Sequence, residues 1–224
     1  MPDGSLSLPA RLCLLAWDSE RPGGGADTAR LHHLVRAGAL TELARRGLLT
    51  DDDGIATPAD LDSRTGDAVL DGLLELVRES LPRRWRAWVR SYARVTFDAV
   101  REQLVAGGYL RAEKKRVLGV FPSVDHVLAR PAAARALRAQ VRAVLDGERP
   151  AGEVSERDAT VAALAAAAEL RGLGPVRERS RRERRTEELT ERGAAAAPGL
   201  GTVLREVRAA VSAETARAVA STGG

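Results

Sequence analysis

The stretch that decides the fold is Val100–His126, VREQLVAGGYLRAEKKRVLGVFPSVDH, where a helical pattern changes to strand and turn. We expect a helix over Val95–Gly107 that ends at Gly107 and Gly108, because glycine commonly terminates helices. The segment that follows, Tyr109–Leu128, has the short apolar runs and turn residues of a β-hairpin. The sequence therefore predicts one ribbon in an otherwise helical chain.

The predicted ribbon joins a basic segment to an apolar one. It contains the only two lysines of a chain with 35 basic residues. If the ribbon is exposed, it is a contact surface for a partner or a membrane, because unpaired strand edges and apolar patches promote association. The alternative is a hairpin folded back against the core, and the residues alone leave both open. The basic residues are Lys114, Lys115 and Arg116, and the apolar residues are Val117, Leu118, Val120 and Phe121.

The remainder of the chain has the composition and periodicity of helices. Apolar residues make up 44% of the sequence and aromatic residues only 3%, so leucine, valine and alanine must form the core. We expect one mainly α domain over residues 1–224, with its core at about 6–221 and one or two small β-hairpins; the second lies at Leu48–Ala56. Helices are predicted at Leu6–Trp17, Thr28–Arg46, Asp67–Glu79, Arg83–Tyr92, Pro131–Leu145, Val154–Leu170, Val176–Glu191 and Thr202–Ala220.

Charge and targeting signals favour a cytoplasmic protein. The net charge of +4 permits an anionic partner without demanding one. No secretory signal is evident at Met1–Asp3, and no stretch approaches the roughly 20 apolar residues of a membrane span. A single cysteine, Cys13, excludes a disulfide framework. We therefore expect that any membrane contact occurs at the surface of the bilayer.

Residue patterns that support catalysis or metal binding are missing from the sequence. It contains no phosphate-binding glycine loop, no dinucleotide-binding glycine motif and no Gly-x-Ser-x-Gly motif. His32 and His33 are adjacent, and a helix would point them about 100° apart, which suits a metal ion poorly. The turn Asp51–Gly54 lacks the further ligands of a calcium loop. We expect no enzyme activity, no catalytic residue, no cofactor and no metal site.

The densest basic run is Arg177–Arg185, RERSRRERR. On a helix, Arg177, Arg181, Arg184 and Arg185 would share one face, which gives a nucleic-acid binder as one hypothesis. Interspersed glutamates dilute this charge, and no aromatic side chain is present to stack on bases. A solvated helix is the favoured interpretation, so nucleic acid is the weaker choice of partner.

Several segments, in this order and spacing, resemble the Golgi phosphoprotein 3 family in its bacterial branch. The resemblance covers nearly the whole chain, and each segment by itself is a weak signal. Trp88 also follows where the family carries a tryptophan. The segments are Leu8–Arg21, GALTELARRGLL (Gly38–Leu49), TGDAVLDGLLELVRES (Thr65–Ser80), Val100–His126 and RRERRTEELTERG (Arg181–Gly193).

The resemblance implies a mainly α fold with a protruding hairpin and a lipid-binding function. Eukaryotic members are peripheral membrane adaptors that bind phosphatidylinositol 4-phosphate and hold the tails of Golgi glycosyltransferases. Their lipid pocket uses one tryptophan and three arginines. Arg36 and Arg94 match two of the arginines, whereas the third falls on Phe97 and the tryptophan falls near Asp27. The resemblance thus implies a head-group site at Arg36 and Arg94.

Together these observations predict a peripheral protein on the inner face of the membrane. Its partner would be an anionic phospholipid surface, with Lys114–Arg116 at the head groups and Val117–Phe121 at the interface. A protein client is a further expected partner. The alternative is a cytoplasmic interaction module that forms homo-oligomers through the hairpin, and the second alternative is a nucleic-acid binder that uses Arg177–Arg185.

Overall fold

The computed structural model describes residues 6–17, 29–117, 121–170, 172–173 and 179–222. It is mainly helical with two small antiparallel sheets, which confirms the predicted fold class. The helices are α1 (Leu8–Ala16), α2 (Ala29–Arg45), α3 (Ala68–Glu79), α4 (Trp85–Arg90), α5 (Ala93–Ala106), α6 (Pro131–Asp146), α7 (Glu156–Ala167), α8 (Arg179–Ala194) and α9 (Leu200–Thr222), with a short 3₁₀ turn, η2, at Ala151–Glu153.

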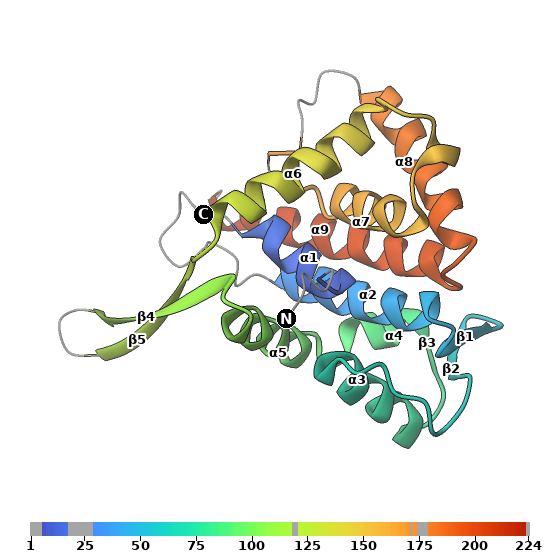
Figure 1. The fold of residues 1–224 in the computed structure, drawn as a ribbon, viewed down its shortest axis with the longest axis horizontal. Helices are drawn as coiled ribbons and strands as arrows, with labels where there is room; N and C mark the ends of the chain where they lie inside the picture. Colours follow the sequence, from blue (N-terminus) through green and yellow to red (C-terminus); the bar gives the residue numbers. More distant parts are fainter. Residues whose placement is uncertain (1–5, 18–28, 118–120, 171, 174–178, 223–224) are drawn as a thin grey trace.

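Helix α2 lies at the centre of the fold. It packs against α1, α4, α5 and α9. Helices α6, α7 and α8 lie on one side of α2, and helices α3 and α5 lie on the other side (Figure 1). Close packing of α1 on α2 depends on Gly38, because a Cβ atom there would lie 2.6 Å from Leu12 Cδ1. The small side chains in the middle of α2 therefore let its neighbours approach closely.

The first sheet is built from three short strands at one end of the molecule. Strands β1 (Leu49–Asp52) and β2 (Ile55–Pro58) form the expected small hairpin. A third strand, β3 (Arg83–Arg84), pairs with β2. The sequence predicted a helix from Arg83 to Tyr92, and this is wrong at both ends, because α4 runs only from Trp85 to Arg90. The pairing with β2 removes the first two residues from the helix.

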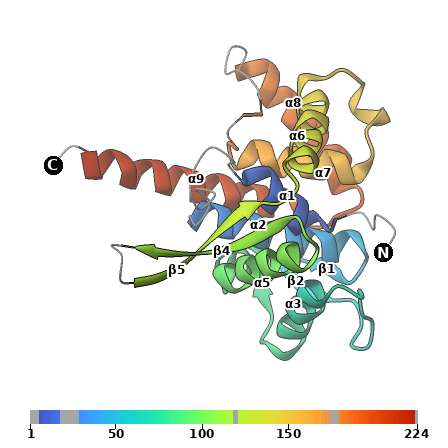
Figure 2. The ribbon, with the colours of Figure 1, turned by 60° about the vertical axis from the view of Figure 1, so that its left-hand side comes forward.

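The second sheet is the hairpin of β4 (Leu110–Val117) and β5 (Phe121–Leu128). It projects away from the helical body in two views, so the expected protruding hairpin is confirmed (Figures 1 and 2). Its base is fixed by Leu110, which is buried, and by Tyr109, whose carbonyl accepts a hydrogen bond from Ala129 N at 2.9 Å. The C-terminal half of α9 extends from the same side of the body (Figure 2).

Within the described residues, the helices are all too short or too polar to cross a bilayer.

Candidate functional site

The guanidinium of Arg36 lies inside the protein, where it connects three helices. The side chain is only 2% exposed. Its Nε donates to the carbonyl of Trp88 at 3.0 Å, and its Nη1 donates to Thr96 Oγ1 at 2.8 Å. These bonds join α2 to α4 and α5. Its Nη2 has no hydrogen-bond partner among the described residues. Arg36 thus has a structural role, and its Nη2 is buried without a partner among the described residues.

Burial lowers the pKa of Arg36 to about 10. The guanidinium therefore remains protonated at neutral pH, and the charge lies inside the protein. The indole of Trp88 offsets part of the lost hydration, because the guanidinium carbon lies 5.9 Å from the ring centroid. The cation of Arg83 approaches the same ring at 5.4 Å. Sequence reasoning gave Trp88 no role in this site, although the resemblance had singled out the residue.

Arg94 lies in the first turn of α5 and points into solvent. Its side chain is 69% exposed, and its Nε lies 3.7 Å from Asp98 Oδ2. Thr96, which accepts a bond from Arg36, lies two residues further along the helix. The structure thus brings Arg36 and Arg94 to the same turn of α5, one from the inside and one at the surface. Their joint role in binding a head group stays a prediction.

The position that would supply a third arginine belongs to the core. Phe97 is 1% exposed, and its ring centroid lies 4.8 Å from that of His32. The guanidinium of Arg101 lies 5.5 Å from the Phe97 ring. By the resemblance, the tryptophan of the family's lipid pocket falls near Asp27, which lies outside the described residues. Of the three positions that match the arginines of the family, only Arg36 and Arg94 can therefore supply a guanidinium.

The hairpin presents a cation and an apolar side chain directly opposite each other. Lys114 is exposed and pairs in register with Val124, which is 53% exposed. Nearer the body, the charge is mixed, because Glu113 accepts a bond from Arg111 at 2.6 Å. The backbones of Lys115, Arg116, Val117 and Phe121 belong to the ladder, but their side chains lie outside the described part, and Leu118 and Val120 lie wholly outside it.

The basic run on α8 does not form one exposed face. Arg185 is 8% exposed, and its Nε and Nη2 donate to the carbonyls of Val144 at 3.0 Å and of Arg149 at 2.7 Å. It thereby satisfies carbonyls at the C-terminal end of α6 and just after it. Arg181 and Arg184 are exposed. The expected face shared with Arg185 is therefore wrong, and Arg177 lies outside the described residues.

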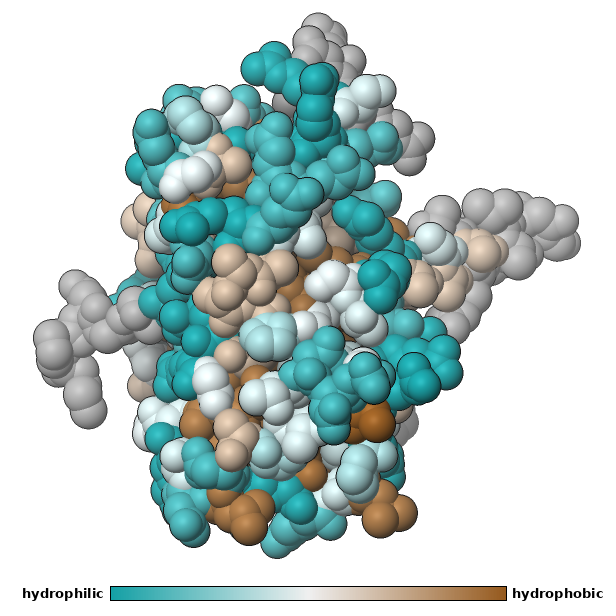
Figure 3. Space-filling model, turned by 90° about the vertical axis from the view of Figure 1, so that its right-hand side faces the viewer, coloured by the Kyte–Doolittle hydropathy of each residue, from teal (hydrophilic) through white to brown (hydrophobic). Residues whose placement is uncertain are grey.

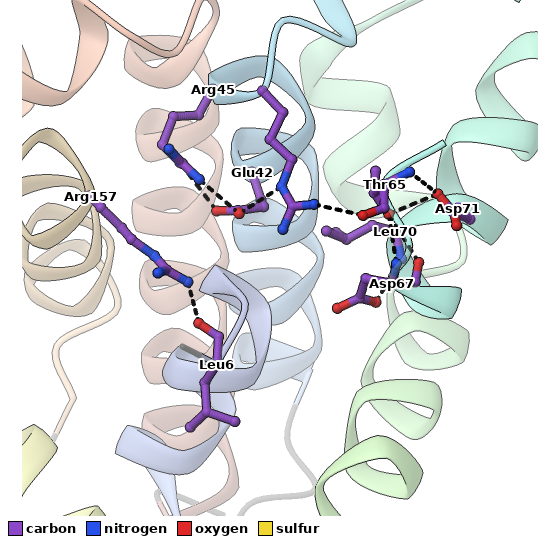
Figure 4. Close-up of polar contacts among 9 residues, drawn as sticks. Leu6, Glu42, Arg45, Thr65, Asp67, Leu70, Asp71 and Arg157 are labelled. Atoms are coloured by element: carbon purple, nitrogen blue, oxygen red, sulfur yellow. Dashed lines mark hydrogen bonds and ion pairs between the residues drawn. The ribbon is translucent and has the colours of Figure 1, made fainter. Parts of the chain in front are cut away.

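A buried carboxylate, Glu42, is held between Arg45, the last residue of α2, and Arg46, which directly follows the helix (Figure 4). It is 0% exposed, and it accepts from Arg45 Nη2 and from Arg46 Nε, both at 2.9 Å. Burial alone would raise the pKa of Glu42, but the bonds and charges of both arginines outweigh it and lower the pKa below its ordinary value. Glu42 therefore stays ionised at neutral pH and is a structural anion, not a general acid.

The segment Thr65–Gly66–Asp67 starts α3 and ties it to α2. The carboxylate of Asp67 accepts bonds from the backbone N–H groups of Val69 at 3.0 Å and Leu70 at 3.2 Å, as an N-cap does. Thr65 Oγ1 donates to Asp71 at 2.7 Å. Figure 4 shows the contacts with Leu70 and Asp71 beside the Glu42 cluster. This part of the sequence is therefore explained by helix initiation.

The described residues offer little for catalysis. Burial raises the pKa of the Cys13 thiol to about 12, which keeps it protonated and unreactive at neutral pH. Among these residues there is also no group of three or more histidine, cysteine, aspartate or glutamate side chains that could hold a metal ion. The chemistry that the site can support is the binding of an anion by arginine.

Comparison with known proteins gives one family. A model of the family Golgi phosphoprotein 3 (GPP34) matches residues 8–211. The match begins at the first residue of α1 and reaches into α9, so it includes Arg36, Arg94 and the β4–β5 hairpin. A comparison with curated protein sequences gave no match.

Proposed function

The chain belongs to the Golgi phosphoprotein 3 family, and on this basis we propose that it is a peripheral membrane adaptor that binds anionic lipid head groups. The family is one of non-enzymatic adaptors. The observation that carries the proposal is the projecting β4–β5 hairpin with Lys114 exposed on it. In this proposal the protein attaches to the inner face of the membrane through the hairpin, and a protein client binds elsewhere on the surface.

The physical terms favour reversible attachment. Each basic residue near an anionic surface contributes about 1 kcal/mol, so Lys114, Lys115 and Arg116 together contribute about 3 kcal/mol. An apolar side chain that becomes fully buried in the interface adds about 1.5–3 kcal/mol. Neither contribution alone anchors a protein, but the two together would give reversible binding. Salt weakens only the contribution of the basic residues.

We assign the selection of the head group to Arg94 and Arg36. A phosphate monoester accepts charge-assisted hydrogen bonds from arginine. Arg94 is exposed and can make the first contact, whereas Nη2 of Arg36 is buried and becomes a donor to the head group only when the side chains that cover it move aside. A phosphatidylinositol 4-phosphate-like head group fits this chemistry. Because two arginines are present where the family has three, we expect weaker discrimination among phosphorylated lipids.

Vesicle co-sedimentation tests the proposal. Wild-type protein should sediment with anionic vesicles, not with neutral ones, and added salt should release it. Leu118→Asp combined with Phe121→Asp should abolish sedimentation. Replacing Lys114, Lys115 and Arg116 by glutamine should weaken it, while the same charge change at three exposed arginines outside the hairpin should not; these are Arg64, Arg149 and Arg184. Equal binding to neutral and anionic vesicles would overturn the proposal.

The open edges of the hairpin favour a second candidate function, which is oligomerisation. Strands β4 and β5 pair only with each other among the described residues, so each has one edge available to another copy. Light scattering of the Leu118→Asp, Phe121→Asp variant separates the two functions. A lower mass with unchanged vesicle binding would favour the oligomerisation module, whereas an unchanged mass with lost vesicle binding would favour the membrane adaptor.

A further inference from the structure

A basic cavity lies at the end of the molecule opposite the hairpin. It is found where the first sheet meets α4 and the beginning of α9 (Figure 1), and Figure 3 views the molecule from this end. Its volume is about 360 Å³, within the range of small-ligand pockets. The residues that line it are Gly54, Arg84, Arg86, Thr202, Arg205 and Glu206.

The walls of this cavity are held together by Trp85. Its indole Nε1 donates to Asp51 Oδ1 at 2.8 Å, and its backbone N–H donates to the carbonyl of Gly54 at 3.2 Å. Gly199, at the start of α9, lies against the indole so closely that a Cβ atom would be 2.4 Å from Trp85 Cε2. The turn, α4 and α9 therefore form one frame, and the flanking arginines are held at a fixed site.

The arginines of the cavity are not neutralised by the carboxylate beside them. Glu206 already pairs with Arg90 at 2.7 Å. Arg205 donates to Thr202 Oγ1 at 2.8 Å, which orients its guanidinium without removing its charge. In the described part of the chain, Arg84 and Arg86 make no ion pair. The cavity thus holds an excess of positive charge.

The acidic residues of the neighbouring turn limit this excess. Asp52 and Asp53 are exposed and lie just before Gly54, but they do not line the cavity. Asp51 is engaged by Trp85 and by the N–H of Gly54 at 3.0 Å. Their charge makes a strongly charged polyanion a poor partner, and a compact anion that fits between the arginines a better one.

We propose that this cavity binds the phosphoryl group of a small soluble phosphate ester, at a site separate from the lipid site. Arginine forks match phosphate oxygens in geometry and charge. Thr202 lies in the first turn of α9, where the positive end of the helix dipole adds to the attraction. Because the hairpin projects from the opposite end, a membrane bound by the hairpin does not reach the cavity (Figures 1 and 2).

Calorimetric titration with inorganic pyrophosphate tests this inference, with citrate as an anion of similar charge at neutral pH that lacks phosphorus. In about 0.15 M salt, wild-type protein should bind pyrophosphate at millimolar concentration or below. Arg84→Gln combined with Arg86→Gln should weaken binding about tenfold or more, because charge-assisted bonds are lost. Arg135→Gln combined with Arg184→Gln removes equal charge from exposed sites elsewhere and should leave binding within about twofold of wild type.

The outcomes are distinct. Absence of pyrophosphate binding, equal affinity for citrate, or equal weakening by both double variants would overturn the inference. The Arg84→Gln, Arg86→Gln variant should also bind phosphatidylinositol 4-phosphate vesicles as wild type does, and loss of that binding would assign the cavity to a lipid and overturn the soluble ligand. Equal unfolding temperatures of the three proteins exclude misfolding as the cause of any difference.

Discussion

Replacing Glu42 by glutamine should destabilise the protein at neutral pH. The carboxylate is 0% exposed and has Arg45 and Arg46 as partners. Breaking a buried ion pair by removing one partner costs about 3–5 kcal/mol. Here the loss is smaller, because the arginine side chains are 27% and 31% exposed and water can solvate them. Glutamine also keeps one acceptor oxygen, so we expect a loss of about 2–3 kcal/mol in the free energy of unfolding.

The loss should depend on pH in a defined direction. The pKa of Glu42 is lower in the folded protein than in the unfolded chain, where it is about 4.3. Its contribution is therefore complete above that value and disappears as the pH falls through the folded-state pKa. Wild type and Glu42→Gln should differ most at neutral pH and converge as the pH falls below the folded-state pKa of Glu42.

Denaturant unfolding and thermal melting at several pH values measure this effect. For a chain of 224 residues, an unfolding entropy of about 2 cal/mol/K per residue converts the expected loss to a fall of about 4–6 °C in Tm. Glu75→Gln is a matched control, because Glu75 is exposed on α3. The reasoning would be refuted if Glu42→Gln were as stable as the control at neutral pH, or if its deficit did not shrink in acid.

Two further predictions concern the packing of the core. Gly199→Ala should lower the free energy of unfolding by about 2–4 kcal/mol, because its φ of +78° is unfavourable for alanine and the new Cβ would displace Trp85. Gly47 has a φ of +73° and open space around it, so Gly47→Ala measures the backbone effect alone. Equal losses of stability in the two variants would contradict a clash with the indole. Cys13 should react with a thiol reagent only as fast as the protein unfolds, because it is 0% exposed and its pKa is raised to about 12. Rapid stoichiometric labelling of the native protein would contradict this prediction and show that the thiol is accessible.

Local patterns in the sequence predicted most of the fold. The apolar residues Leu70, Leu73, Leu74 and Val77 repeat at helical spacing in the predicted helix Asp67–Glu79, and in the structure they form the buried face of α3. The pair Gly107 and Gly108 marked the end of α5, where Gly108 has a φ of +71°. These features depend on neighbours within a few residues, so the sequence contains all the information that they need.

Features that depend on distant partners were not predictable in this way. Strand β3 exists because Arg83 and Arg84 meet β2, which lies more than twenty-five residues earlier. The inward orientation of Arg185 depends on the carbonyls at the end of α6. For Arg36, the resemblance suggested contact with a ligand, but only the fold shows that the side chain is also bound by α4 and α5. The charges of these arginines in the sequence do not indicate which distant strand, carbonyl or helix each one meets.

The capping role of Thr65–Asp67 assigns this segment to the scaffold of the protein and not to a ligand site. This segment builds the junction of α2 and α3, and its polar groups are occupied by the backbone of α3 and by Asp71. Its polar groups are used up within the start of α3, so they are not available to a ligand. A Thr-Gly-Asp segment at the same place in another chain would therefore indicate the same start of a helix and would carry no information about the ligand of that chain.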